Sequence, residues 1–153
     1  MMSDRRLPTS QDCNCFAVRS AARHVTQFYD QFLAPIGLRT SQFSILSKLN
    51  RLGPLTINAL AKEMVMDRTT LGRNIQPLER DGLIRTEQVE TDLRAKELHL
   101  TTAGEKRLQE AFSGWSRAQA QFEQSFGPDR SAVLRALLRA VVADKSTAVQ
   151  PAA

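Results

Sequence analysis

Cysteine and histidine are scarce in this sequence, with two of each among 153 residues. Cys13 and Cys15 are separated by a single residue, so a disulfide between them would be strained, and neither has another partner within the chain. With just two histidines in the whole chain, the sequence also disfavours a zinc site. The sequence therefore disfavours a disulfide scaffold and a metal centre, and we expect no cofactor.

Long apolar runs are absent as well. No window approaches the ~20 apolar residues that a membrane-spanning helix needs, and the first residues, "MMSDRRLPTSQDCNC", lack the apolar core of a signal peptide. We expect a cytoplasmic protein with no membrane partner. An enzyme is the least favoured class, because the sequence contains no nucleophile elbow, phosphate loop or paired carboxylate motif.

The net charge of +5 favours an anionic partner only weakly. Residues 51–100 contain eight basic and eight acidic side chains, so the basic excess lies in the flanking segments. The case for nucleic-acid binding therefore depends on where individual charges fall.

Helical spacing of apolar residues covers most of the chain. In the N-terminal half it predicts a helix from Cys15 to Leu33, a second that Thr40 or Ser41 caps, and a short third from Ile57 to Met64 with Thr56 as its N-cap. The segment "TTAGEKRL" starts a long helix that ends at Gly127, and a last helix begins at Pro128. The long helix carries an apolar stripe that a second copy of the chain would cover.

The segment "DRTTLGRNIQPLERDG" predicts a helix from Arg68 to Arg80, opened by Asp67 and closed by Gly82. Pro77 lies inside it, at a typical cost of about 3 kcal/mol. We expect a bend at Pro77 that separates the first two turns of this helix from a last part that packs on the segment after Gly82; the alternative is a tolerated proline near a helix end.

After Gly82 the apolar period changes to two. "LIRTEQVE" and "KELHLT" flank a charged tip and predict a two-stranded hairpin. We expect His99, in its second strand, to be exposed. The predicted fold class is mainly α with a small β-hairpin wing.

A short helix, a tight turn and a second helix form a helix-turn-helix, in which the second helix enters the major groove. Arginine suits guanine, asparagine suits adenine, and threonine contacts phosphate or a thymine methyl group. The candidate reading residues are Arg68, Thr69, Thr70, Arg73 and Asn74. Arg94 and Lys96, at the hairpin tip, would reach the adjacent minor groove and the phosphates. The alternative for the helix alone is an ordinary solvated surface helix.

Two segments, "LTINALAKEMVMDRTTLGRNIQPLERDGLI" and "DLRAKELHLTTAGEKRL", resemble the MarR family of winged helix-turn-helix regulators over about residues 13–145. The resemblance implies a homodimer with an interleaved helical dimerisation region at 13–36 and 103–145, a DNA-binding domain at 40–101, and flexible ends at 1–12 and 146–153. It also implies a repressor that binds a pseudo-palindromic operator on double-stranded DNA and is released by a small, often aromatic effector. Asp92 and Arg94 match the family's wing pair, so Arg94 would enter the minor groove and Asp92 would orient a neighbouring basic side chain.

The segment "CNCFAVRSAARHVTQFYD" resembles the first helix of the organic-peroxide-sensing branch of that family. Cys15 aligns with the sensor cysteine and Tyr29 with a tyrosine that binds it, although Thr40 stands where the branch has its second tyrosine. Cys15 and Tyr29 are about 21 Å apart along one helix, so contact would need the other subunit. Arg19 and the helix N-terminus would lower the pKa of the Cys15 thiol, and Cys13 would act as the resolving thiol. A small buried cysteine is the alternative.

Conventional ligand sensing remains the main hypothesis beside peroxide sensing. His24 would either line a ligand pocket or lie at the surface or an interface, and Trp115 belongs either to a dimer core or to a ligand box. A non-specific, nucleoid-type DNA binder is a further alternative, which would bind random and operator DNA equally once the salt is matched.

Overall fold

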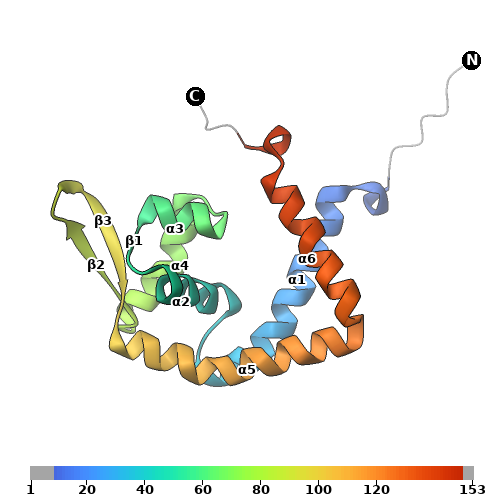
Figure 1. The fold of residues 1–153 in the computed structure, drawn as a ribbon, viewed down its shortest axis with the longest axis horizontal. Coiled ribbons are helices and arrows are strands. Elements are labelled where there is room, and N and C mark those ends of the chain that lie inside the picture. The colour runs from blue at the N-terminus through green and yellow to red at the C-terminus, as the bar shows by residue number, and fades with distance from the viewer. Residues whose placement is uncertain (1–8, 150–153) are drawn as a thin grey trace, which may run out of the picture. The chain divides into compact units, whose positions relative to one another are not determined.

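The computed structural model describes residues 9–149, which are largely helical with one small sheet (Figure 1). In chain order the elements are η1 Ser10–Asp12, α1 Asn14–Leu33, η2 Ala34–Ile36, α2 Thr40–Leu52, β1 Leu55–Thr56, α3 Ile57–Met64, α4 Arg68–Arg80, β2 Ile84–Val89, β3 Asp92–Leu100, α5 Thr102–Phe126, α6 Pro128–Ala143 and η3 Lys145–Thr147. None of the helices in residues 9–149 has the length and apolar character needed to cross a membrane.

The chain packs as two compact units, one ending at Trp115 and the other beginning at Ser116. This division by packing does not test the expected functional division into 13–36 with 103–145 and 40–101, which stays a prediction. Of the expected flexible ends, residues 10–12 form the short 3₁₀ helix η1, and residues 146–147 belong to η3. Residues 1–8 and 150–153 lie outside the described part.

The predicted helices are confirmed, with differences at their first residues. α1 begins at Asn14, because the Cys13 Sγ accepts a hydrogen bond from Phe16 N at 3.4 Å and acts as the N-cap. α2 begins at Thr40 itself, so the expected cap at Thr40 or Ser41 is wrong: Arg39 is the N-cap.

The side chain of Thr40 turns to α1 instead. Its backbone N–H and its hydroxyl both donate to Asp30 Oδ1, at 2.7 and 2.6 Å. The start of α2 is thereby tied to the end of α1.

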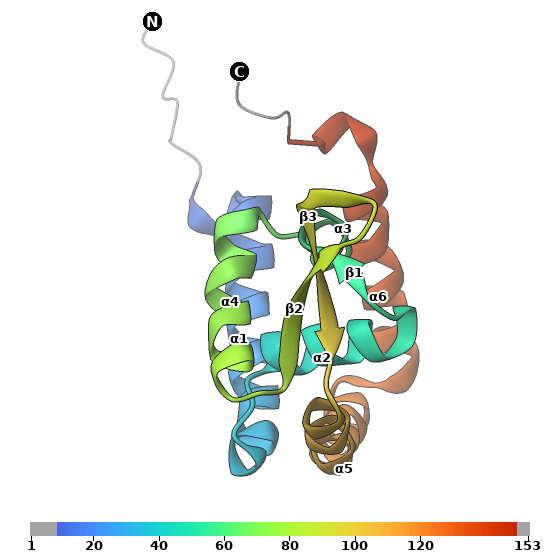
Figure 2. The same ribbon diagram turned by 90° about the vertical axis from the view of Figure 1, so that its left-hand side faces the viewer.

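The sheet has three strands, where the sequence predicted two. β2 and β3 form the expected antiparallel hairpin, and β1 pairs with the other edge of β3 through Leu55 opposite Leu98 and Thr56 opposite Glu97 (Figure 2). β1 consists of only two residues, which are too few to show an alternation of apolar and polar side chains, so the sequence pattern did not reveal it.

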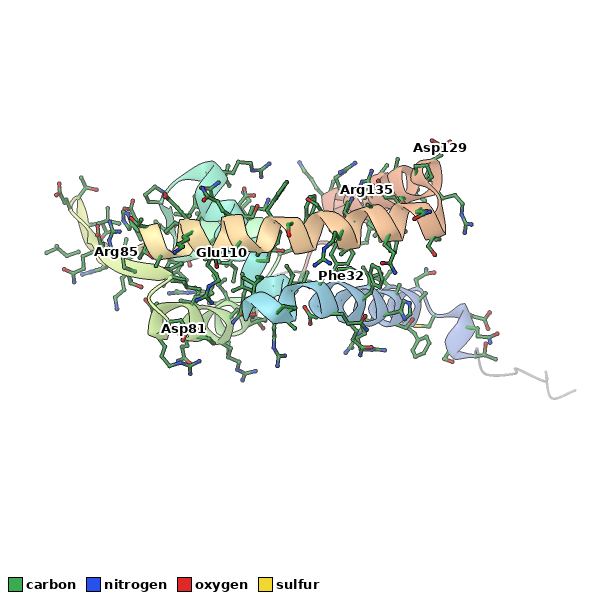
Figure 3. The ribbon with its side chains drawn as sticks, turned by 90° about the horizontal axis from the view of Figure 1, so that it is seen from below. Phe32, Asp81, Arg85, Glu110, Asp129 and Arg135 are labelled. Carbon is green, nitrogen blue, oxygen red and sulfur yellow. The ribbon has the colours of Figure 1, made fainter. Side chains whose placement is uncertain are left out.

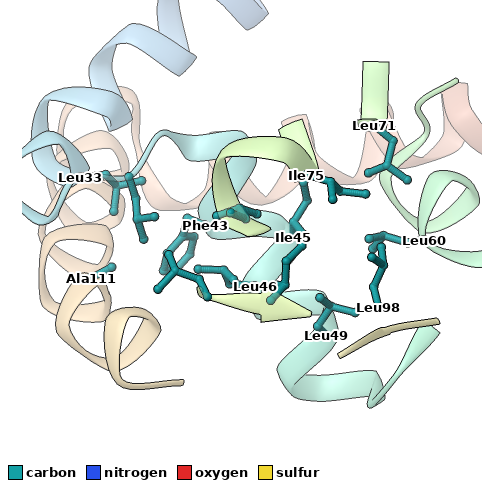
Figure 4. Packing of buried hydrophobic residues seen from close by; sticks show 14 of the residues in the cluster. Leu33, Phe43, Ile45, Leu46, Leu49, Leu60, Leu71, Ile75, Leu98 and Ala111 are labelled. Carbon is teal, nitrogen blue, oxygen red and sulfur yellow. The ribbon is translucent and has the colours of Figure 1, made fainter. Parts of the chain in front are cut away.

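A single apolar cluster holds the helices and the sheet of the first unit together (Figure 4). α4 contributes three buried residues on one side, Leu71, Ile75 and Leu78. The same cluster includes side chains from α1, α2, α3, β2, β3 and α5: Leu33, Phe43, Ile45, Leu46, Leu49, Leu60, Ile84, Leu98 and Ala111. Burying one such leucine contributes about 1.5–3 kcal/mol, so this cluster fixes which face of α4 remains outside.

The first turn of α5 is fastened to the corner between α4 and β2. Thr101 N donates to Leu83 O at 3.1 Å, and the Thr101 hydroxyl donates to Gly82 O at 2.6 Å. Gly82 has φ +71°, as expected of a residue that closes α4. Gly104 lies against Leu83 O so closely that a Cβ there would overlap it.

Candidate nucleic-acid interface

The turn between α3 and α4 sets the start of the second helix. Val65 closes α3 in the left-handed region at φ +53°, and Met66 N donates to Ala61 O at 2.9 Å. Asp67 then caps α4, as predicted: its carboxylate accepts from the Thr70 backbone N–H at 2.7 Å and from the Thr70 hydroxyl at 2.9 Å. The backbone hydrogen bond from Thr70, followed by the hydroxyl bond, lowers the pKa of Asp67.

α4 presents one polar face to solvent. With Leu71, Ile75 and Leu78 buried, the exposed side chains of its first three turns are Arg68, Thr69, Thr70, Arg73 and Gln76. Arg68, Thr69 and Arg73 therefore lie where the sequence predicted, and the Thr70 hydroxyl is held by the cap.

Asn74 is placed differently from the other candidates. It is half-buried; its Oδ1 accepts from the Ser41 hydroxyl of α2 at 2.8 Å, and its Nδ2 donates to Thr70 O at 2.9 Å. The Asn74 amide thus joins α4 to α2 in this structure. Ser41 lies 33 residues away in sequence, so no local pattern indicated this contact.

A cleft of ≈ 490 Å³ separates α4 from the sheet. It brings three predicted residues together, Arg68, Thr69 and Lys96. The full lining is Ile57, Arg68, Thr69, Gly72, Ile75, Gln76, Glu79, Thr86, Lys96 and Leu98. Glu79 is the acidic residue of the cleft, and its carboxylate accepts a hydrogen bond from Thr86 of β2. α4 continues through Pro77 to Arg80. Residues on both sides of Pro77 line the cleft, so the division of the helix at Pro77 stays a prediction.

The wing tip is shaped by a bulge in β3. Gln88 pairs with Lys96 whereas Val89 pairs with Asp92, so three residues of β3, 93–95, have no opposite partner on β2. Arg94 lies in this bulge with its side chain exposed. Lys96 is in the paired part of the strand, one step below the tip where it was expected. The Asp92 carboxylate accepts from the Arg94 backbone N–H at 3.0 Å, so its partner is that backbone group rather than a basic side chain.

The other face of the hairpin carries a charged cluster. Arg85 Nε and Glu87 Oε1 are 2.6 Å apart, and the Arg85 hydrogen bond lowers the pKa of Glu87. His99 Nε2 lies 3.3 Å from carboxylate oxygens of both Glu87 and Glu97. The expectation of an exposed His99 is wrong, because its side chain is only 17% exposed beneath these two residues. Arg85 and Asp81 mark the hairpin base and the end of α4 in Figure 3.

Comparison with known proteins shows which family has this arrangement of helices and wing. A model of the MarR family matches residues 38–96. The HTH-type transcriptional regulator YwoH of Bacillus subtilis (strain 168) is 32% identical over 93 residues, which cover 61% of this chain and about two thirds (67%) of that protein. The M. tuberculosis transcriptional regulator MosR is 34% identical in sequence, and its crystal structure matches this one with a TM-score of 0.75. The match covers 89% of this chain and 100% of that chain. A structure of MosR in complex with DNA is 36% identical with a TM-score of 0.75, covering 86% of this chain and 98% of that one.

This chain belongs to the MarR family. It is a transcriptional regulator with a DNA-binding fold, not an enzyme. The helix-turn-helix of this MarR protein is α3 and α4, and its wing is β2 and β3.

A second cleft, of ≈ 450 Å³, lies beside α1 and α2 of this MarR protein. Its lining is Val25, Thr26, Tyr29, Thr40, Phe43, Ser44, Ser47, Lys48, Arg51 and Trp115. Trp115 stacks on Phe43 with ring centroids 6.1 Å apart. The cleft thus combines an aromatic wall with two basic side chains, Lys48 and Arg51.

Of the four effector or redox candidates, only Tyr29 lines this cleft. Cys15, Arg19 and His24 are exposed on α1 and lie outside its lining, so the structure does not gather the four. Both cysteines are free and exposed. In residues 9–149, no cluster of three or more histidine, cysteine or acidic side chains could hold a metal ion.

Proposed function

We propose that this MarR-family regulator acts in the cytoplasm as a homodimeric repressor that binds a pseudo-palindromic operator. The observation that supports DNA reading most directly is the outer face of α4, where Arg68, Thr69 and Arg73 are exposed while the opposite face is locked in the core. Arg94, exposed in the wing bulge, enters the neighbouring minor groove. Lys96 adds attraction to phosphate.

Exposed apolar side chains support the homodimer. On α6, Val133, Leu137 and Val141 are 57%, 61% and 55% exposed. On α1, Phe16 is 47% exposed. A second copy that covers both helices would remove this apolar surface from water.

Replacing Arg94 with alanine tests the wing. We expect at least a tenfold loss of operator affinity in fluorescence anisotropy, because one minor-groove guanidinium is removed, while the dimer mass in light scattering stays the same. Arg85→Ala is the matched control: it removes the same charge from the same hairpin, at a residue that pairs with Glu87. Equal affinities for the wild type and Arg94→Ala would remove Arg94 from the interface.

The cleft beside α1 and α2 is the proposed effector site. Its volume falls within the usual range of small-molecule pockets, about 300–1,000 Å³, and its lining suits an aromatic compound. Trp115 is the chain's single tryptophan, so its fluorescence reports on this cleft directly. We expect a releasing effector to change Trp115 emission at the concentrations that dissociate DNA. An effector that releases DNA without changing the emission would bind elsewhere.

Peroxide sensing by Cys15 is the second candidate, favoured by its exposure in the first turn of α1. The Cys15 thiolate would attack an organic hydroperoxide, take up one peroxide oxygen as sulfenic acid and release the alcohol. Hydroperoxide should then dissociate the DNA complex of the wild type but not that of Cys15→Ser. Dissociation of both complexes would exclude Cys15 as the sensor.

A further inference from the structure

The exposed face of α4 extends beyond the candidate reading residues, which end at Asn74. Thr69, Arg73 and Gln76 follow one another at i, i+4 and i+7, a spacing that places them on one face of a helix. All three are exposed. Gln76 also lines the cleft between α4 and the sheet, together with Thr69. It therefore lies on the reading face, immediately before Pro77.

The two carboxamides of α4 have opposite surroundings. Asn74 is half-buried, and its oxygen and nitrogen are engaged by Ser41 and Thr70. None of the described residues holds the Gln76 carboxamide by a hydrogen bond, and Gln76 is exposed at the cleft. A carboxamide that reads a base must offer its oxygen and its nitrogen together. Gln76 meets this requirement in the free protein, and Asn74 does not.

Gly72 has no side chain, so the surface of α4 next to Gln76 is unobstructed. A Cβ at this position would meet nothing within 4 Å, so the space above the glycine is open. Gly72 precedes Gln76 by four residues and lines the same cleft. A glycine in mid-helix permits close approach of a ligand to the backbone, and here it leaves room for DNA beside the Gln76 side chain.

We propose that Gln76 is a specificity-determining residue of the operator complex, where its carboxamide pairs with N6 and N7 of an adenine in the major groove. Asn74 holds α4 against α2 and reads no base. This assignment rests on the proposed sequence-specific DNA binding and adds to it the residue and the base.

The test is operator selection from a randomised DNA library with the wild type, Gln76→Ala and Asn74→Ala. The wild type should select a motif with adenine at symmetric positions. Gln76→Ala should lose that preference and bind the wild-type motif about 5- to 150-fold more weakly, the usual discrimination of one bidentate pair. Asn74→Ala is the matched control and should select the unchanged motif, even if thermal melting shows lower stability.

A second variant separates base reading from a structural role. Gln76→Glu keeps the length of the side chain but offers only acceptors, so the preference should move from adenine towards cytosine, whose N4 amino group donates. A merely structural role would not change the chosen base.

The outcomes are distinct. A motif and affinity unchanged by Gln76→Ala overturn the role of Gln76 while sequence-specific binding stands. A wild type that selects no motif overturns sequence-specific binding, and the role of Gln76 with it. A motif altered by Asn74→Ala and not by Gln76→Ala assigns the reading to Asn74.

Discussion

Replacing Gly72 with alanine adds one methyl group to the middle of α4, where the structure leaves open space. Alanine in a helix interior is more stable than glycine by about 0.5–1 kcal/mol, chiefly because the unfolded chain loses conformational freedom. The new Cβ has no neighbour within 4 Å, so no packing cost opposes this gain. For a chain of this size the expected rise in melting temperature is about 1–4 °C.

Gly114→Ala is the matched control, in which the same methyl group meets protein. A Cβ at position 114 would lie 2.5 Å from Phe32 O, at the close approach of α5 to α1 where Phe32 is marked in Figure 3. Overpacking costs about 1–3 kcal/mol, which exceeds the gain in helix propensity. We therefore expect the melting temperature to fall.

Differential scanning calorimetry and urea titration of the three proteins at one protein concentration give both shifts. Shifts of opposite sign support the packing described for α4 and α5. A fall in the melting temperature of Gly72→Ala would refute the reasoning, because it would mean that the space above Gly72 is occupied in the folded protein.

Three further predictions concern charge and strain. Lys96→Ala should weaken DNA binding about equally for all sequences and lower the slope of log affinity against log salt by about one; an unchanged slope would place Lys96 away from phosphate. The lowered pKa of Asp67 means that its charged form stabilises the fold above the carboxyl's ordinary pKa of 3.8, and that this contribution disappears as the pH falls through the lower folded value. The urea midpoints of the wild type and Asp67→Asn should therefore converge in acid, and a constant difference would contradict the shift. Val65→Gly relieves a left-handed backbone that costs a non-glycine residue about 1–2 kcal/mol, so the variant should unfold at equal or higher urea than the wild type. A clearly lower midpoint would show that the Val65 side chain contributes more than the strain costs.

Local chemistry explains which parts of the fold were predictable. Asp67 and Gly82 set both ends of α4 through contacts within a few residues, so their side-chain types were enough to place the helix. β1 was missed because its two residues are too few to show the apolar alternation of a strand. Only their pairing with β3 makes them a strand.

The candidate site shows the same limit. Arg68, Thr69 and Arg73 could be placed by helical spacing, since the apolar face of α4 decides where the polar face lies. Asn74 shared that spacing, but its amide is engaged by Ser41, a residue that only the fold brings close. Gln76 was overlooked because the candidates were limited to the first two turns of α4, which end at Asn74. Its i+7 spacing from Thr69 was the signal available in the sequence.

The attachment of α5 to the corner after α4 has a practical consequence for chimeras. Thr101 donates to Leu83 O and Gly82 O, and Gly104 has no room for a side chain beside Leu83. A recognition helix transplanted from another regulator can replace residues 67–81 without disturbing these contacts. A graft that extends past Gly82 must also bring the donor's own equivalent of residues 101–104. The segment that can be exchanged by itself therefore ends at Asp81.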